Sequence, residues 1–142
     1  MTKAIAFINV FILLFITGNI FAENRESVKI GRKMSDWLLI DEWGKGSKTY
    51  IDQSSIEDNS GIKRAWIKYY MEPPGKDKIS QKDVKEMLML EEYDCKQRKF
   101  CVDRIIFNYL DGSSGEPLTP EHQWAPVTGR KEIIFRFICK ST

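Results

Sequence analysis

The three cysteines, Cys95, Cys101 and Cys139, have the most distinctive chemistry in this chain. In an oxidising compartment they would form one disulfide and leave one thiol, and three pairings exist. A bond between Cys95 and Cys139 would close a long loop, for which the chain-entropy model gives the larger stabilisation, about 3 to 4 kcal/mol. A bond between Cys95 and Cys101 would close only a short loop. The residues by themselves leave the pairing open.

Nucleophilic catalysis and metal binding have little support in the residue types. His122 is the only histidine, and it lies in a proline-rich segment between Glu121 and Gln123. A catalytic base must lie beside its nucleophile, and this segment gives no indication of such a pair. We therefore expect His122 to be a solvated loop histidine. A zinc site needs several Cys and His ligands at short spacing, and Cys95 and Cys101 with one distant histidine do not supply that set. We predict no catalytic residue, no metal site and no cofactor, with haem ligation by His122 as a minor alternative.

The clustered acidic residues indicate surface charge more than acid–base catalysis. Glu91, Glu92 and Asp94 lie close together, but neighbouring side chains in a strand point to opposite faces, so Glu91 and Glu92 would not pair. We expect both to be solvated. Asp94 precedes Cys95, and a carboxylate at that place is suited to accept hydrogen bonds from the backbone of a turn.

The clearest candidate for a binding site is basic. The segment Lys96-Gln97-Arg98-Lys99 concentrates cations at a predicted turn, with Arg104 downstream. The whole chain has 22 Lys and Arg against 20 Asp and Glu, so it is nearly neutral, which argues against a nucleic-acid binder. A local positive cluster on such a chain would attract acidic glycoproteins or polysaccharides. We predict Lys96, Arg98, Lys99 and Arg104 as ligand-binding residues; the alternative is a solvated hairpin tip without a ligand.

The elements that position these residues are expected to be mainly strands. Residues 37–40 and 48–52 flank a Gly-rich turn and predict a hairpin. Residues 62–71 alternate strictly. One face would carry Ala65, Ile67, Tyr69 and Met71, and the other Arg64, Trp66, Lys68 and Tyr70. Trp66 and Tyr70 would be a second candidate binding surface unless the core covers them.

The second half of the chain predicts an antiparallel pair and a closing helix. Residues 73–75 would end the preceding strand, and residues 76–82 read as an exposed, mobile loop. Residues 85–95 fit helix or strand, but residues 96–99 can turn the chain into a second alternating run. That run, 100–109, would carry Cys101, Asp103, Ile105, Phe107 and Tyr109 on one face. Thr128 would cap a helix running to Lys140, with its apolar stripe at Ile134, Phe137 and Ile138. The expected class is α+β, an antiparallel sheet with the C-terminal helix packed on one face.

The first residues predict export. Lys3, the apolar run 4–18 and the small residue Ala22 form a signal peptide over residues 1–22. Residues 23–142 would then form one domain, with no stable membrane span after cleavage. An uncleaved anchor is the alternative, because residues 4–22 approach the ~20 residues that cross a bilayer. No cysteine precedes Cys95, so we expect no lipid anchor.

Several short motifs, taken in order, resemble the surface-adhesin protein E family of exported bacterial domains. The motifs are Trp37, Tyr50-Ile51-Asp52, Ser55-Ile56, Trp66, Tyr93-Asp94-Cys95, Trp124 and Ile138-Cys139. They span nearly all of the chain after the predicted signal peptide. The resemblance implies an antiparallel sheet with a C-terminal helix, and a disulfide between Cys95 and Cys139 that tethers helix to sheet.

The resemblance also implies a function. The family's named adhesin binds host matrix glycoproteins such as vitronectin and laminin, and dimerisation and haem binding are associated with it. We therefore expect an exported, non-enzymatic binding module in the periplasm or at the surface of a bacterium, with a protein ligand and a homodimer as one candidate assembly. The alternative is a periplasmic accessory or inhibitor protein that binds another bacterial protein.

Overall fold

The computed structural model describes residues 36–140, which form one antiparallel sheet and one α-helix. The predicted signal peptide, residues 1–22, lies outside the described residues. The strands are β1 (Trp37–Trp43), β2 (Ser47–Asp52), β3 (Glu57–Asn59), β4 (Ile62–Lys76), β5 (Asp83–Asp94), β6 (Lys99–Tyr109) and β7 (Ala125–Pro126), and the helix is α1 (Lys131–Lys140). Within the described part of the chain, no helix has the length and apolar character needed to cross a membrane.

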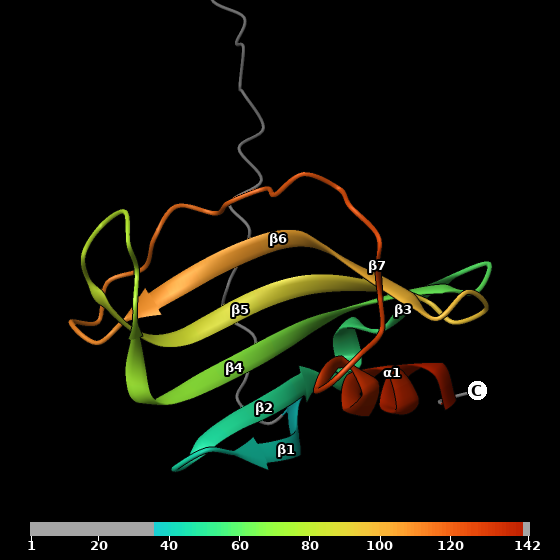
Figure 1. Ribbon diagram of the computed structural model, residues 1–142, viewed down its shortest axis with the longest axis horizontal. Helices are drawn as coiled ribbons and strands as arrows, with labels where there is room; N and C mark the ends of the chain where they lie inside the picture. The colour runs from blue at the N-terminus through green and yellow to red at the C-terminus, as the bar shows by residue number, and fades with distance from the viewer. Residues whose placement is uncertain (1–35, 141–142) are drawn as a thin grey trace, which may run out of the picture. The chain divides into compact units, whose positions relative to one another are not determined.

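The seven strands lie in the order β1-β2-β4-β5-β6-β7, and β3 pairs with β4 beside the end of β2 (Figure 1). Every pairing is antiparallel. The predicted hairpin is β1–β2, and the segment that fitted helix or strand is β5, paired on both sides. The predicted α+β class, an antiparallel sheet with a C-terminal helix, is confirmed.

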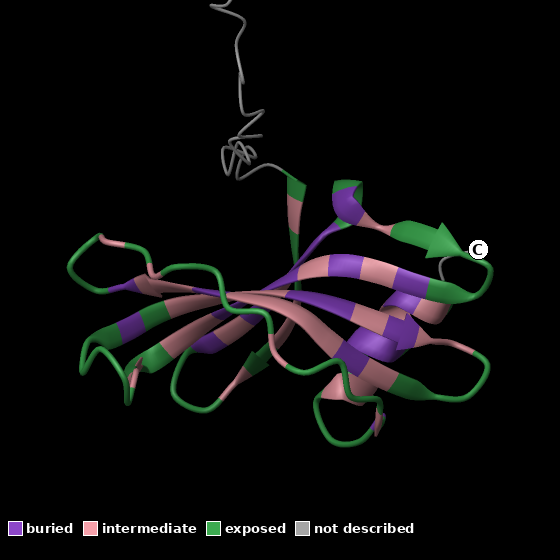
Figure 2. Cartoon of the chain, turned by 90° about the horizontal axis from the view of Figure 1, so that it is seen from above, coloured by how far each residue is buried: buried purple, intermediate pink, exposed green. Residues whose placement is uncertain are grey.

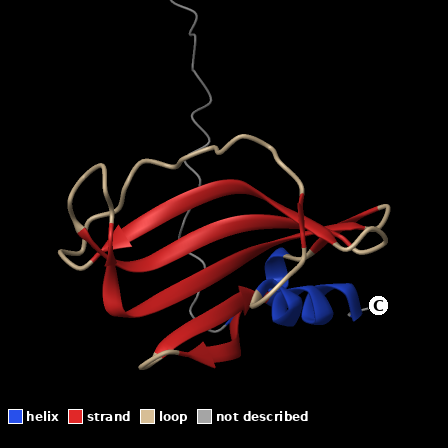
Figure 3. Cartoon of the chain, viewed as in Figure 1, coloured by secondary structure: helices blue, strands red, loops and turns tan. Residues whose placement is uncertain are grey.

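The core lies between one face of the sheet and α1, which is seen against the sheet in Figure 3. Alternation in β4 places Ala65, Ile67 and Tyr69 on this face, as predicted, and all three are buried. The helix contributes side chains at spacings of one, three and four residues, which form a single apolar stripe: Ile134, Phe135 and Ile138. Figure 2 shows buried residues gathered where α1 meets the sheet, with the loops exposed.

The helix begins at Lys131, two residues later than predicted, because a cap at Thr128 would make Gly129 the first helical residue. Gly129 has φ +58°, a left-handed conformation that cannot belong to a right-handed helix. The N–H of Lys131 donates to the Thr128 carbonyl at 3.2 Å, so a tight turn leads into α1. A glycine just before the helix was the signal against the earlier start.

Strand β4 does not end at residues 73–75, as predicted, but continues to Lys76. The register with β5 is interrupted between Tyr70 and Gly75 and then resumes, with Gly75 opposite Val84. The two prolines lie within the interruption, where the missing N–H groups cost no ladder hydrogen bond. The chain can therefore pass both prolines and pair again.

A β-bulge in β6 corrects the predicted face of that strand. Val102 pairs with Glu91 and Arg104 with Leu90, so Asp103 is an extra residue. An inserted residue shifts the alternation by one. As a result, Cys101 lies on the face away from α1, whereas Ile105 faces the helix side, opposite Met89.

Candidate functional site

The predicted basic segment forms the tip of the β5–β6 hairpin, and this tip is bonded to α1. Cys95 and Cys139 form a disulfide with a Cα–Cα distance of 5.6 Å. This is the pairing that the family resemblance implied. Asp94 Oδ1 accepts hydrogen bonds from the N–H groups of Lys96 (3.0 Å) and Gln97 (2.8 Å), as expected for this residue. The turn is thus fixed by its own hydrogen bonds and by a covalent bond to the helix.

Arg98 reaches across to the helix, although its side chain is still exposed. Its guanidinium group donates to both carboxylate oxygens of Glu132 at 2.7 and 2.8 Å, and it lies 4.7 Å from the ring centroid of Phe135. The Arg98 hydrogen bond keeps the pKa of the Glu132 carboxyl group below its ordinary value. The charge of Arg98 is therefore partly neutralised, and its side chain connects the tip to α1.

The structure separates the other predicted cations. Lys96 and Lys99 are exposed at the tip. Arg104 lies further along β6, opposite Leu90 and partly buried, so it is not part of the tip. Lys140, which sequence reasoning missed, is exposed and directly follows Cys139, so the disulfide brings it beside the hairpin. We call Lys96, Lys99 and Lys140 the hairpin-tip cations; a known disulfide partner was the signal that could have identified Lys140.

The second candidate surface, around Trp66 and Tyr70, lies on the sheet face opposite α1 and is partly exposed. Trp66 lines a shallow pocket together with Ser55, Glu57, Arg64 and Leu90. The helix leaves this face uncovered, so these aromatic residues are not part of the main core.

Lys68, on the same face, is buried between two aromatic rings. Its Nζ lies 4.6 Å from the Trp37 ring centroid and 4.7 Å from that of Tyr50. Burial lowers the pKa of Lys68, and the nearby Glu86 carboxylate opposes this effect. The aromatic rings of Trp37 and Tyr50 thus hold a buried cation on the face that the strand pattern predicted for Lys68.

Glu91 is fully buried under α1, and the prediction that it would be solvated is wrong. Tyr69 and Tyr93 donate hydrogen bonds to its two carboxylate oxygens at 2.6 and 2.5 Å, and Lys131 Nζ donates to Oε1 at 2.5 Å. Burial, reinforced by the Glu91 charge, raises the pKa values of both tyrosines above the ordinary value. Lys131 comes from the helix, 40 residues away, so the cluster joins sheet and helix. No signal in the local sequence identifies this pairing.

A different cluster lies on the opposite face, where Glu92 and Cys101 are cross-strand partners. Cys101 Sγ lies 3.6 Å from Glu92 Oε2 and 3.6 Å from His122 Nε2. Burial, together with the charge of Glu92, raises the pKa of the Cys101 thiol to about 12. His122 is half exposed, as expected of a loop histidine, but it is in contact with the free cysteine. Cys101 and His122 are 21 residues apart in the sequence, so their contact could not be predicted from the spacing.

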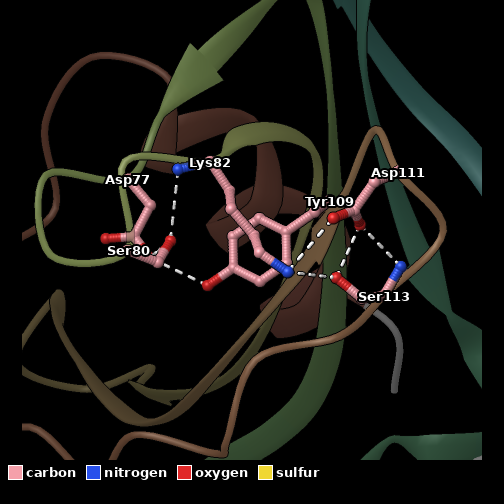
Figure 4. A network of polar contacts seen from close by, with 6 residues as sticks. All are labelled: Asp77, Ser80, Lys82, Tyr109, Asp111 and Ser113. Atoms are coloured by element: carbon pink, nitrogen blue, oxygen red, sulfur yellow. Dashed lines mark hydrogen bonds and ion pairs between the residues drawn. The ribbon is translucent and has the colours of Figure 1, made fainter.

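The turn after β4 is exposed, as predicted, and is tied to the end of β6 by a polar network (Figure 4). Asp77 Oδ2 accepts hydrogen bonds from Ser80 Oγ (2.6 Å) and the Tyr109 hydroxyl (2.8 Å). The hydrogen bond from Ser80 is the main cause that lowers the pKa of Asp77 to about 2. These contacts order a segment that its composition marked only as a loop.

Asp111 anchors the other half of this network. Ser113 Oγ donates to its carboxylate at 2.5 Å, and this hydrogen bond is the main cause that lowers the pKa of Asp111 to about 2. Lys82 lies 3.1 Å from the same carboxylate and 5.1 Å from the Tyr109 ring centroid. The two turns are therefore held together by charge-assisted contacts.

Comparison with known proteins agrees with this architecture. A family model described as surface-adhesin protein E matches residues 37–140. The selenomethionine form of protein E from Haemophilus influenzae superposes with a TM-score of 0.53 at 15% identity, covering 78% of this chain and 90% of that one. A second crystal form of the same protein gives 0.52 at 13% identity, covering 77% and 91%. At such identities the likeness of structure shows the fold alone. No curated protein sequence matches the chain significantly.

Proposed function

The chain belongs to the surface-adhesin protein E family, and on that premise we propose that it is an exported, non-enzymatic module that binds a protein ligand at the cell surface. The observation that carries the proposal is the hairpin tip, where exposed cations stand on a turn fixed to α1 by Cys95–Cys139. A turn held in this way loses little conformational freedom when it binds, which favours affinity. Membership of an adhesin family favours binding over catalysis.

The ligand best suited to this tip is an acidic segment of a host matrix glycoprotein of the vitronectin or laminin type. The chain has a formal net charge of only +2, so long-range attraction is weak and recognition would depend on local charge. Lys96 and Lys99 project from the tip, and Lys140 adds a third cation beside the disulfide. Arg98 stabilises the tip through Glu132 instead of contacting the ligand.

The test is a comparison of two charge-reversed variants in binding to immobilised vitronectin and laminin. Lys96→Glu/Lys99→Glu changes the tip and leaves Arg98 in place. The control, Lys78→Glu/Lys85→Glu, changes two exposed lysines near the other end of β5. Each pair changes the formal net charge by minus four, from +2 to −2. We expect the tip variant to bind at least about tenfold more weakly and the control to bind almost as the wild type does.

Two results would contradict the proposal: no binding by the wild type, or equal losses in both variants. The alternative function, a periplasmic accessory or inhibitor protein, is distinguished from a surface adhesin by where the protein is located in the cell. If protease added to intact cells digests the protein, the protein is at the cell surface and accessible to a host. If the protein is digested only after the cells are permeabilised, it lies in the periplasm together with its partner.

A further inference from the structure

Glu92, Cys101 and His122 bring three different metal-binding atoms together on the sheet face opposite α1. Glu92 and Cys101 are directly opposite in the β5–β6 register, so their side chains project to the same side. Cys101 is 1% exposed, whereas the side chain of Glu92 is 19% exposed and that of His122 is 52% exposed. The sulfur atom thus lies at the bottom of the cluster, and the imidazole lies on the solvent side.

The position of His122 is set by strand pairing on both sides of it. The connection from β6 to β7 runs along the outer side of β6 (Figure 1). It is joined to β6 by a bridge between Leu118 and Ile105, and again where β7 pairs with residues 99 and 100. The His122 ring also makes an edge contact with Trp124, with 5.6 Å between ring centroids. The imidazole is therefore held over Cys101 by elements on either side.

The distances among the three atoms are close to those of a tetrahedral zinc site. Sγ–Oε2 and Sγ–Nε2 are both 3.6 Å, and Nε2–Oε2 is 3.9 Å. With bonds of about 2.3 Å to sulfur and about 2.0 Å to nitrogen or oxygen, a tetrahedron separates sulfur from the other two atoms by roughly 3.5 Å and those two from each other by roughly 3.3 Å. Only the last separation, between His122 and Glu92, must shorten for a tetrahedral site, and His122 is the more exposed of these two side chains.

We propose that Glu92, Cys101 and His122 form a binding site for a divalent cation of the zinc class, with water in the fourth position. A thiolate combined with an imidazole selects zinc-like cations over magnesium or calcium, which prefer oxygen ligands. On binding, the Cys101 thiol loses its proton to solvent, and the sulfur–metal bond takes its place. The two negative ligands then balance the two positive charges of the cation. This inference is independent of protein binding by the hairpin tip.

Cobalt(II) and zinc(II) titrations of the purified protein, with its disulfide intact, test the site. We expect Co²⁺ to give a thiolate-to-metal charge-transfer absorption and the ligand-field bands of tetrahedral geometry, both removed by excess Zn²⁺. Cys101→Ser should lose the charge-transfer absorption. In competition with a chromophoric chelator, Glu92→Gln and His122→Ala should each weaken zinc binding by more than about tenfold.

The matched control is Glu121→Gln, which removes the carboxylate next to His122 in sequence. Glu121 accepts a hydrogen bond from Gln123 at 2.9 Å, so zinc affinity should stay within about twofold of the wild type. Far-ultraviolet circular dichroism checks that each variant is folded. If Cys101→Ser does not fold, His122→Ala replaces it in the test, because substitution of a half-exposed residue should not disturb the fold. The proposal is overturned if the wild type shows no charge-transfer absorption, if Cys101→Ser retains it, or if Glu92→Gln binds zinc as tightly as Glu121→Gln.

Discussion

Glu91 illustrates at the residue scale how a buried charge can be accommodated. Its carboxylate has no exposed surface, and it accepts hydrogen bonds from two tyrosine hydroxyls and one ammonium group. Nζ of Lys131 also lies 2.7 Å from the Tyr69 hydroxyl and 5.0 Å from the Phe100 ring centroid. A buried carboxylate without a cation would be costly, because desolvation strongly disfavours an unpaired charge.

The first prediction concerns this pair. Lys131→Met removes the cation and leaves the carboxylate in place, so the free energy of unfolding should fall by roughly 3 kcal/mol. Glu91→Gln/Lys131→Met should recover most of that loss, because the remaining groups are neutral. Urea unfolding at neutral pH measures both changes, and the same measurement on the single variant Glu91→Gln completes the double-mutant cycle that gives the coupling energy.

The control for this prediction lies on the same helix. Arg136 forms an exposed ion pair with Glu132, with 65% of the arginine side chain accessible. Arg136→Met should therefore change the free energy of unfolding by no more than about 1 kcal/mol. Equal losses in Lys131→Met and Arg136→Met would show that burial does not distinguish the two ion pairs.

At the scale of single elements, period-two alternation was the reliable sequence signal. Residues 62–71 were assigned to the correct strand and the correct faces because every second side chain meets the core. The bulge at Asp103 gave no such signal, since an inserted residue has no characteristic type and is visible only in the partner's register. The same limit applies to β4, where two prolines suggested an end but lie in an interruption of the ladder.

The second prediction belongs to the ordered turn after β4. The folded state lowers the pKa of Asp77 to about 2, compared with about 3.9 for an unfolded aspartate. The ionised form is therefore favoured by folding. The resulting stabilisation is complete above about pH 4 and is lost as the pH falls through about 2.

Hydrogen exchange at the amides of Ile79 and Gln81 reports this loss. Both amides donate to Asp77, one to its side chain and the other to its carbonyl oxygen. Protection relative to the intrinsic exchange rate should drop several-fold between pH 4 and pH 2, and Asp77→Asn should produce the same drop at pH 5. Asp83→Asn, which removes only an exposed contact with Lys76, should leave protection unchanged. A pH-independent protection factor would rule out this role for Asp77.

At the scale of the whole molecule, the sites depend on contacts between distant segments. His122 reaches Cys101 only because the connection from β6 to β7 returns along β6. The sequence of this connection is irregular and proline-rich, so no periodic pattern predicts the path that it takes. Lys131 reaches Glu91 because the helix docks over the sheet. In contrast, the tip residues Lys96 and Lys99 could be predicted, since a hairpin turn follows directly from two adjacent alternating segments.

The third prediction concerns the bond that unites the middle of the chain with its end. Cys95 and Cys139 are 44 residues apart, and cross-linking a loop of that length stabilises the folded state by about 4 kcal/mol in the chain-entropy model. The exposed Arg98–Glu132 pair that also joins hairpin and helix should contribute at most about 1 kcal/mol.

Cys95→Ala/Cys139→Ala should therefore unfold at a clearly lower urea concentration than the wild type, and the amides of residues 95–99 should exchange faster. Reductant should shift the wild type toward the variant and leave the variant itself unchanged, because Cys101 has no partner to lose. Equal unfolding midpoints for oxidised wild type and variant would mean that the contacts of α1, without the covalent bond, are sufficient to hold the hairpin tip in place.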